Sequence, residues 1–406
     1  MHIMFVTGEY PPMPGGVGAY TQELSRALAA LDVRVSILTS QAAADPDAAR
    51  PGALVRVLPV VRRWDWAFWR TASNLAAEVR ADWVHVQYQT AAFGMHPAVN
   101  FAPGRWRAGG QRVAWTYHDL RVPYLFPKAG KRLRTWVTER PAHTADLVIV
   151  TNEDDRQQLV DEQVDAVNIP IGSNIQGRVL SPTERSSRRR SYGYRDDDLV
   201  LAYFGFLNRS KGGLTLVRTL HRLAQSHSNV YLLMIGEQVG ASDVTNFAYL
   251  QEVQALIRKL GLERRVQWTG NQPDNEVAAD LNACDVLLMP YADGASLRRG
   301  TLMAGLANGC AIVTTTPATP LPELVDGRDV LYIPPENDHA LAAAVERVAG
   351  DPGLAAQLRQ NARVSSAQFG WDAIARAHVA LYTKMQERDS HSVRAASVSE
   401  QSEKHR

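Results

Sequence analysis

One repeated pattern constrains the fold more than any other feature of this chain. A short apolar run ends at a glycine or a polar turn, and an amphipathic helical segment follows. Buried parallel strands typically read as uninterrupted Val, Ile and Leu runs, and most of these runs do. The pattern predicts an α/β chain with two Rossmann-like, doubly wound parallel sheets. The expected strands are residues 2–7, 33–38, 55–60, 83–88, 113–118 and 147–150 in the first sheet, and 199–206, 230–235, 266–269, 286–289 and 312–315 in the second.

The chain length sets the domain organisation. With 406 residues, the chain is long enough for two or three domains that each bury a core. We expect an N-terminal domain at residues 1–175 and a second domain at 199–370, with the stretch 181–198, rich in Ser, Arg and Asp, as the end of the linker. We expect a helix at 371–387 to pack back on the first domain. The tail at 388–406 has almost no apolar residues and is expected to be disordered.

Composition excludes several classes of function. The 44 Lys and Arg residues nearly balance the 42 Asp and Glu residues, so the net charge is +2, without the basic excess typical of duplex binding. We therefore expect no nucleic-acid partner. Cys284 and Cys310 are too few for a disulfide framework or a four-cysteine zinc site. The apolar run after Met1 is too short for a signal peptide or a membrane span, which favours a cytoplasmic protein.

A glycine-rich loop follows the first expected strand. Residues 8–18 read GEYPPMPGGVG, and a helix follows with Val17, Tyr20 and Leu24 on one face. Unpaired amides at a helix N-terminus, together with the helix dipole, favour an anion such as a phosphate. The loop is not a dinucleotide fingerprint, because Thr21 stands at the third glycine position. A tight structural turn explains it equally well.

Two basic turns at expected strand ends extend this pattern into the second domain. Arg209 and Lys211 precede one helix, and Arg298 and Arg299 precede a helix of small residues that starts near Leu302. Arginine and lysine side chains both bind phosphate oxygens well, and ligands of open α/β folds bind at the carboxyl end of the parallel sheet. Solvated surface charge is the alternative for each turn alone. Three such turns, split between two domains, predict one interdomain cleft for a polyanionic ligand.

A histidine stands at a strand end of the first domain. His118 precedes Asp119 at the carboxyl end of an expected strand, where open α/β sheets place their sites. His85 and Gln87 on another strand are expected nearby. A structural histidine is the alternative, and the adjacency to Asp119 favours a functional one.

These pieces together resemble the retaining nucleotide-sugar glycosyltransferases of family 4, which have the GT-B architecture of two Rossmann-like domains. The resemblance covers about residues 1–386, and the order and spacing of its pieces make it specific. Its motifs are Glu9-Tyr10-Pro11-Pro12 with the glycines at 15, 16 and 18, His118-Asp119, the IPIGSN run at 169–174, Gly205 with Lys211-Gly212, Ile235-Gly236-Glu237 and Pro322-Glu323.

The resemblance implies roles for particular residues. Gly15, Gly16, Arg209 and Lys211 would hold the diphosphate of a nucleotide-sugar donor, and His118 would contact the sugar near the reacting carbon. The resemblance thus makes His118, Arg209 and Lys211 the catalytic candidates. Backbone at Thr269, Gly270 and Asn271 would face the nucleobase. On the acceptor or sugar side we place Glu9, Tyr10, His85, Gln87 and Asp119.

Two departures from the family pattern matter. Members usually carry an arginine after the glycine of the second domain's first strand, whereas Phe206 follows Gly205 here. The family's two glutamates, separated by seven residues, are replaced by Ser296 and Ala304. The local stretch instead suggests a basic diphosphate clamp made by Ser296, Arg298, Arg299, Gly300 and Thr301.

The sequence therefore predicts transfer of a sugar from a nucleoside-diphosphate sugar to an acceptor hydroxyl, with retention. We expect no metal and no cofactor, because no Asp-x-Asp stands at a strand end and Asp45-Pro46-Asp47 lies in a loop. The alternatives are an inactive glycosyltransferase-like binding subunit, and an epimerase or hydrolase of nucleotide sugars on the same fold. The base, the sugar and the acceptor are not predicted.

Two stretches of the first domain interleave aromatic and basic residues, at 62–70 and 124–136. Such stretches suit an anionic membrane surface, so we expect peripheral membrane contact. Core aromatics and a solvated helix face explain them about as well.

Overall fold

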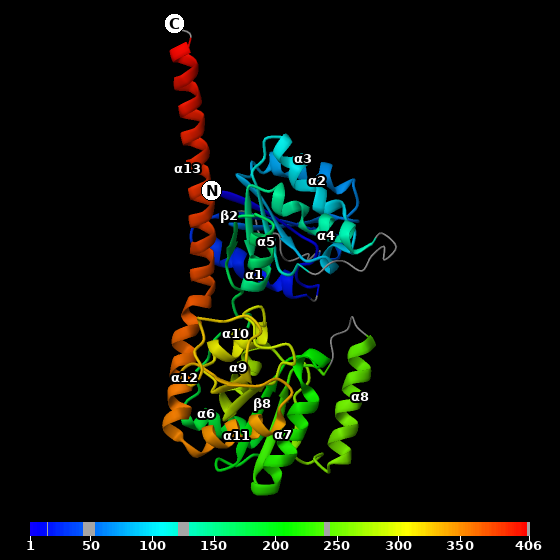
Figure 1. Cartoon of the computed structure of the whole chain (residues 1–406), viewed down its shortest axis with the longest axis vertical. Coiled ribbons are helices and arrows are strands. Elements are labelled where there is room, and N and C mark those ends of the chain that lie inside the picture. Colours follow the sequence, from blue (N-terminus) through cyan, green and yellow to red (C-terminus); the bar gives the residue numbers. More distant parts are fainter. Residues whose placement is uncertain (14, 44–52, 121–129, 239–243, 404–406) are drawn as a thin grey trace. The chain divides into compact units, whose positions relative to one another are not determined.

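The computed structural model describes residues 1–13, 15–43, 53–120, 130–238 and 244–403. The chain divides into two compact units (Figure 1). The first unit comprises Met1–Ile171 together with Trp371–Arg406, and the second comprises Gly172–Gly370. Each unit is an α/β domain built on one parallel sheet, as the repeated pattern predicts.

The first unit contains a seven-stranded parallel sheet in the order β3-β2-β1-β4-β5-β6-β7. Its strands are β1 (His2–Thr7), β2 (Arg34–Ser40), β3 (Val55–Val61), β4 (Trp83–Tyr88), β5 (Val113–Tyr117), β6 (Leu147–Val150) and β7 (Ala166–Asn168). Its helices are α1 (Gly16–Ala29), α2 (Phe68–Glu78), α3 (Ala98–Ala108), α4 (Lys131–Glu139), α5 (Glu153–Asp161) and α13 (Trp371–Glu403).

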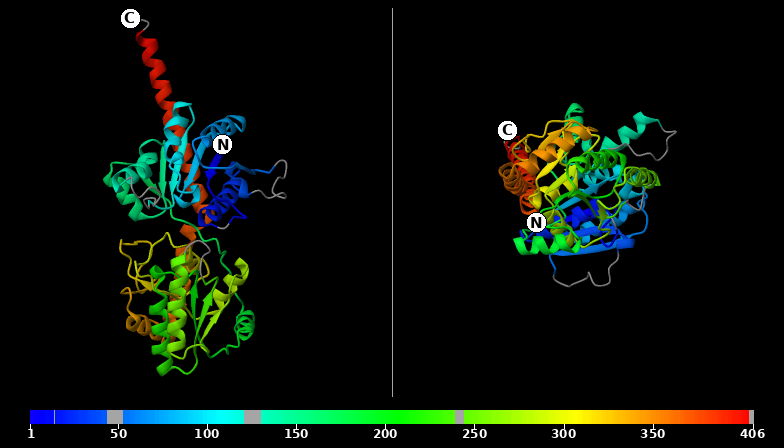
Figure 2. Two further views of the ribbon diagram at one scale, coloured as in Figure 1. Left: turned by 90° about the vertical axis from the view of Figure 1, so that its right-hand side faces the viewer. Right: turned by 90° about the horizontal axis from the view of Figure 1, so that it is seen from below.

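Both faces of this sheet are covered, as the views in Figure 2 show. Alternate residues of a strand point to opposite faces, and β1 accordingly sends Met4 and Val6 into one core and Ile3 and Phe5 into the other. The core that contains Phe5 is closed by α1 and by α13, which contributes Tyr382. The last helix of the chain is therefore part of the first unit, as the sequence predicts.

The second unit contains a six-stranded parallel sheet in the order β10-β9-β8-β11-β12-β13. Its strands are β8 (Leu199–Phe204), β9 (Val230–Ile235), β10 (Val266–Trp268), β11 (Val286–Met289), β12 (Ile312–Thr315) and β13 (Leu331–Ile333). Its helices are α6 (Pro182–Ser191), α7 (Gly213–Ser226), α8 (Val244–Lys259), α9 (Asp274–Ala283), α10 (Gly300–Ala307), α11 (Asp338–Gly350) and α12 (Pro352–Ser366). Both cysteines, Cys284 and Cys310, are buried and unpaired.

The predicted linker is wrong in one respect, because residues 182–191 form helix α6 within the second unit. Ser181 begins this helix with a capping box, in which its hydroxyl accepts from the backbone N–H of Glu184. Arg189 lies fully buried, and its guanidinium donates to the carbonyl oxygen of Ala283 at 3.0 Å and to the carboxylate of Asp285 at 3.2 Å. Arginine pairing, rather than apolar burial, attaches this polar helix.

The predicted disordered tail also differs from the structure. Helix α13 continues to Glu403, beyond the predicted end at 387. The stretch from Trp371 to Glu403 contains no proline and no glycine, and it is rich in Ala, Arg, Glu and Gln, which all favour helix. Low hydrophobicity predicts the lack of a core, but it does not by itself prevent a helix that has already started from continuing.

Candidate functional site

Three glycines, which have no side chains, line the carboxyl edge of the second sheet. Gly205, Gly236 and Gly270 follow β8, β9 and β10, and all three have positive φ, at 104°, 95° and 70°. A methyl group at Gly236 would lie 3.9 Å from the Cα of Gly205, so the two loops approach closely. Side chains would fill this edge, and glycine leaves it open to a ligand.

Thr269 holds the same edge together. Its hydroxyl accepts a hydrogen bond from the backbone N–H of Gly236 at 3.0 Å and lies 3.1 Å from the carbonyl oxygen of Gly270, to which it donates. The residues predicted to face a nucleobase, Thr269, Gly270 and Asn271, therefore lie next to the loop that contains Gly236.

Lys211 is the central charge of this edge. A methyl group at Gly205 would lie 3.0 Å from the Nζ atom of Lys211 and 2.7 Å from the Cγ2 atom of Thr301, so the three residues meet. Burial, with Arg299 as the second cause, lowers the pKa of Lys211 to about 8. Among the described residues, no carboxylate lies within ion-pair distance of its ammonium group. An enclosed, unpaired cation is unfavourable unless an anion joins it.

The start of α10 lies beside Lys211. Thr301 stands in the first turn of this helix, and its hydroxyl bonds to that of Tyr291 at 2.7 Å. The first backbone N–H groups of a helix have no partner inside it, and they favour negative charge together with the dipole. Gly300, the first residue of α10, is exposed.

Arg299 and Arg298 differ in their surroundings. The guanidinium of Arg299 pairs with Asp293, lies 3.4 Å from the hydroxyl of Ser210, and stacks over the ring of Tyr291 at 4.7 Å. Arg298 has no ion-pair partner among the described residues, and its backbone N–H reaches the hydroxyl of Ser296 at 3.5 Å. Arg298 is therefore available to a ligand, whereas Arg299 already has one acid partner.

Arg209 has surroundings different from those of Lys211, although the two residues were predicted to act as a pair. Its guanidinium pairs with Glu252 at 2.6 Å and lies 5.4 Å from the centre of the Tyr249 ring, and its side chain is 72% exposed. It lines an open pocket of about 630 Å³ that also contains Gly212, Asp293 and Glu336. Lys211 does not line this pocket.

The glycine-rich loop of the first unit is not a vacant helix terminus. The Oε1 atom of Glu9 accepts hydrogen bonds from the backbone N–H groups of Val17 at 2.9 Å and Gly18 at 3.3 Å. The chain's own carboxylate thus occupies the anion position at the start of α1. The expectation of free amides is wrong for Val17 and Gly18. Gly16 faces open space, and a phosphate role for Gly15 and Gly16 stays a prediction.

His118 lies at the end of β5, as predicted, and is partly exposed. Its Nε2 atom bonds to the Oε1 atom of Gln87 at 2.9 Å, and the edge of its ring packs with Tyr20 at 4.6 Å. Burial, and secondarily the nearby His378, lowers its pKa to about 3. The ring is therefore neutral at pH 7. It can exchange a hydrogen bond with a hydroxyl, but it does not supply a positive charge.

Three residues predicted on the sugar or acceptor side are buried instead, and one of them is Gln87, which is fully buried and bonds to His118. His85 is fully buried, and Tyr10 is 6% exposed within the core closed by α1. Strand pairing places His85 at the centre of the sheet, under α13. Asp119, by contrast, is partly exposed and accepts a hydrogen bond from the amide of Gln89 at 3.2 Å.

Sequence reasoning missed the contribution of α13 to this region. The hydroxyl of Tyr382 lies 2.5 Å from the Nδ1 atom of His85, although the two residues are 297 positions apart. The apolar spacing of the helix predicts that it packs on the first unit, but no sequence signal identifies the strand it covers.

Some expectations fall outside the described residues, namely the Asp45-Pro46-Asp47 loop and the segment from Tyr124 to Lys128. In the part of the chain that is described, no three His, Cys, Asp or Glu side chains gather as metal ligands. Within the same residues, no helix combines the length and the apolar composition needed to cross a membrane.

Comparison with known proteins agrees with this geometry. Two α/β units, each built on one parallel sheet, match the structures of GT-B glycosyltransferases. Residues 15–174 match the family described as glycosyl transferase 4-like domain, and residues 184–365 match the glycosyl transferases group 1. The chain belongs to the GT-B glycosyltransferases of group 1, and it is a hexosyltransferase-type enzyme.

The relatives with assigned names are distant. A D-inositol 3-phosphate glycosyltransferase of Actinosynnema mirum is 25% identical over 91% of this chain and 92% of its own length. One of Corynebacterium jeikeium is 27% identical over 59% of this chain, and the match spans only 58% of that relative.

Solved structures share the fold. Sucrose-phosphate synthase from Thermosynechococcus elongatus has a TM-score of 0.74 at 21% identity, covering 95% of this chain and 99% of that one. HepE from Anabaena, solved in complex with UDP-glucose, has a TM-score of 0.67 at 19% identity, covering 96% and 100%.

Proposed function

We propose that this enzyme transfers a sugar from a nucleoside-diphosphate sugar to an acceptor hydroxyl, with retention of configuration and without a metal ion. The observation that carries the donor assignment is Lys211, a largely enclosed cation without a carboxylate partner among the described residues, set beside Gly205 and the start of α10. A diphosphate supplies the negative charge that this arrangement lacks.

The chemistry follows from charge. Departure of a nucleoside diphosphate places growing negative charge on the phosphate oxygens, and fixed cations and dipoles stabilise it. At an effective dielectric constant near 20, one cation at 4 Å contributes roughly 4 kcal/mol before desolvation. Lys211, Arg298 and the dipole of α10 would act in this way, in place of a metal ion. The leaving phosphate would serve as the base that takes the acceptor proton.

His118 would act as a neutral hydrogen-bonding group against the transferred sugar. Its pKa of about 3 keeps the ring uncharged at pH 7, so it would orient a sugar hydroxyl without adding positive charge. Asp119 stands next to it on the same loop. The amides of Gly15 and Gly16 would add contacts to the donor.

The relatives guide the choice of substrates. HepE has been solved with UDP and with UDP-glucose, and several relatives are named D-inositol 3-phosphate glycosyltransferase. We therefore propose UDP-sugars as the first donors to test and a phosphorylated polyol as one acceptor class. Glycans and lipids with free hydroxyls complete the acceptor panel.

A thermal-shift panel of UDP-, GDP-, ADP- and TDP-sugars tests the donor. A ligand at 100 times its Kd stabilises the protein by about 2.7 kcal/mol. The Lys211→Met variant should lose the shift given by the selected diphosphate, and the Lys211→Arg variant should keep much of it. An equal shift in the wild type and in Lys211→Met would contradict the assignment.

A binding subunit without catalysis is the second candidate, and one observation favours it. Ser296 and Ala304 stand where the resembling family carries carboxylates, and Ala304 is fully buried. Release of the nucleoside diphosphate separates the candidates: a transferase releases it with an acceptor, a hydrolase without one, and a binding subunit not at all.

We also propose peripheral contact with an anionic membrane through an aromatic surface of the first unit. The stretches at 62–70 and 131–136 meet through Phe101, whose ring centre lies 5.6 Å from that of Trp66 and 5.9 Å from that of Trp136. Trp66 and Trp136 are about half exposed, at 49% and 50%. The guanidinium of Arg140 stacks on both Phe101 and Trp136.

Exposed aromatics next to cations suit the interface of an anionic bilayer. We expect binding to vesicles that contain phosphatidylglycerol to weaken as salt is added, and to weaken in a Trp66→Ser, Trp136→Ser variant. Equal sedimentation with neutral and anionic vesicles would refute this contact.

A further inference from the structure

A chain of hydrogen bonds, buried except at His118, joins His118 to the C-terminal helix. The Nε2 atom of His118 lies 2.9 Å from the Oε1 atom of Gln87, and the amide nitrogen of Gln87 lies 3.5 Å from the Nε2 atom of His85. The Nδ1 atom of His85 lies 2.5 Å from the hydroxyl of Tyr382 on α13. Gln87, His85 and Tyr382 are all fully buried.

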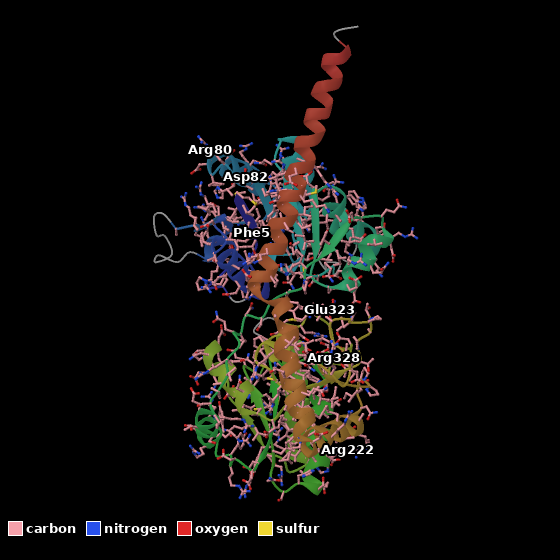
Figure 3. The ribbon with its side chains drawn as sticks, turned by 90° about the vertical axis from the view of Figure 1, so that its left-hand side faces the viewer. Phe5, Arg80, Asp82, Arg222, Glu323 and Arg328 are labelled. Carbon is pink, nitrogen blue, oxygen red and sulfur yellow. The ribbon has the colours of Figure 1, made fainter. Side chains whose placement is uncertain are left out.

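The core around this chain is tightly packed. The ring of Phe5, labelled beside α13 in Figure 3, lies 5.2 Å from that of His85. The ring of Tyr382 packs on Trp83 at 5.3 Å. His378 lies 5.9 Å from His85, but its Nδ1 atom donates to the carbonyl oxygen of Ile374, so it does not join the chain. These contacts restrict the rotamers along the chain.

The orientation of the Gln87 amide sets the direction of every bond. An amide oxygen only accepts, so the Nε2 atom of His118 donates and carries the proton. The amide nitrogen only donates, so the Nε2 atom of His85, which faces it, carries a lone pair. Thr116, whose hydroxyl lies 2.7 Å from the same atom, then donates to it as well.

The proton of His85 is thereby placed on Nδ1. A neutral imidazole carries one N–H, and burial lowers the pKa of His85 well below its usual value, so the ring is neutral. Its Nδ1–H donates to the oxygen of Tyr382. The phenol oxygen is thus the acceptor at the far end of the chain.

We propose that Gln87, His85 and Tyr382 are positioning residues that hold His118 in its Nε2-protonated form, so that its Nδ1 atom presents a lone pair to a hydroxyl. Helix α13 thereby contributes to the N-terminal part of the active site, although none of its residues is required to touch substrate. The role of His118 in catalysis rests on the proposed function, whereas the protonated form of His118 does not.

Loss of the phenol hydroxyl of Tyr382 should reverse the direction of the hydrogen bonds along the chain. In Tyr382→Phe, the Nδ1–H of His85 would be buried without an acceptor, which is costly. If its proton moves to Nε2, His85 can donate to Thr116 instead. The amide nitrogen of Gln87, which is also a donor, would then face the Nε2–H group of His85 unfavourably. The amide of Gln87 then turns over, its nitrogen donates to His118, and the proton of His118 moves to Nδ1.

Nitrogen NMR of the full chain with ¹⁵N-labelled histidine tests this directly, since protonated and unprotonated ring nitrogens have different shifts. His118→Gln assigns the signals. We expect the Nε2–H form of His118 in the wild type and a majority of the Nδ1–H form in Tyr382→Phe. Tyr88→Phe is the matched control, because Tyr88, on strand β4, also has a buried phenol hydroxyl, but that hydroxyl bonds to Thr90 and Asn100 and not to His85.

Gln87→Glu keeps an acceptor at His118 and should retain the Nε2–H form, whereas Gln87→Met should lose it. The Nδ1–H form in the wild type, or an unchanged His118 in Tyr382→Phe, would overturn the proposal. This readout needs no activity, so an enzyme that proves inactive with every donor would refute the proposed function and leave the tautomer result standing.

Where transfer is measurable, Tyr382→Phe should lower kcat about tenfold, the lower end of the effects found for the partners that orient metal-ligating histidines. The KM for the donor should stay unchanged. In a His118→Ala background the same substitution should have no further effect on kcat, because the two residues act through one path. An equal loss in that background would assign Tyr382 a purely structural role.

Discussion

Acidification should destabilise the first unit well above the pH at which carboxylates titrate. His85, His118 and His378 lie within one layer between strands β4, β5 and helix α13, and burial lowers the pKa of each. The value is about 3 for His118 and about 4 for His378. In the unfolded chain each would have its ordinary pKa of about 6.5.

The sign follows from which state binds more protons. Between pH 6.5 and about 4, the unfolded chain takes up a proton at each of these histidines and the native unit does not. Stability therefore falls as the pH is lowered. At 1.36 kcal/mol per pH unit, each histidine costs about 2 kcal/mol at pH 5 relative to neutral pH. His378, whose pKa is about 4, therefore gives a loss of about 2 kcal/mol by itself, and the losses from His85 and His118 add to it.

Urea unfolding followed by tryptophan fluorescence measures this loss in the right part of the molecule. Every tryptophan except Trp268 lies in the first unit. The window from pH 7 to 5 isolates the histidines, because carboxylates stabilised in the native state change their contribution only below about pH 5. The variant His378→Leu removes one titrating group and should reduce the loss by about 2 kcal/mol.

A free energy of unfolding that is constant or rises between pH 7 and 5 would refute this reasoning. A loss of equal size in the wild type and in His378→Leu would show that other groups cause it.

Three further predictions concern the second unit. Affinity for the nucleoside diphosphate selected by the panel should be steady up to about pH 8 and fall above it, because Lys211 loses its proton there. Calorimetry on Lys211→Arg should show a smaller fall in affinity with pH, and an equally steep fall would point to another group. Arg298→Ala should weaken that diphosphate about tenfold, the equivalent of one charge-assisted hydrogen bond, and leave the uncharged nucleoside unaffected; an unchanged diphosphate Kd would remove Arg298 from the site. Arg189→Met should cost about 3–5 kcal/mol of stability, because it leaves buried acceptors without a donor. Scanning calorimetry measures this loss, with Arg190→Met at the exposed neighbouring position as the control. Similar melting temperatures for the two variants would refute the role of Arg189.

The strands that the sequence predicts well are the central ones. The bounds of strands β1, β4 and β6 agree with the prediction, and β6, which reads LVIV, is a continuous apolar run. The short strands β7 and β13, at sheet edges, were not predicted. An edge strand of three residues, such as Leu331–Ile333, lacks a run long enough to stand out from a loop.

The site shows a similar division. Turn chemistry locates Lys211, Arg298 and His118 at strand ends, because that depends on local order along the chain. It does not reveal that the carboxylate of Glu9 caps α1 across eight residues, or that Glu252 pairs with Arg209. Loop conformation and helix packing bring these partners together. A sequence pattern contains no information about such contacts, so it cannot show which charged side chains are already paired.

The first unit is assembled from both ends of the chain, and this has a consequence for biosynthesis. Ribosomal synthesis completes residues 172–370 before Trp371 is made, so the second unit has its whole sequence while the first still lacks α13. Until then, the face of the first sheet that carries Phe5 and His85 is covered by α1 but not by α13, and the hydroxyl of Tyr382 that bonds to His85 is absent. His85 would thus gain its hydrogen-bond partner on α13 only after the whole sequence of the second unit has been made.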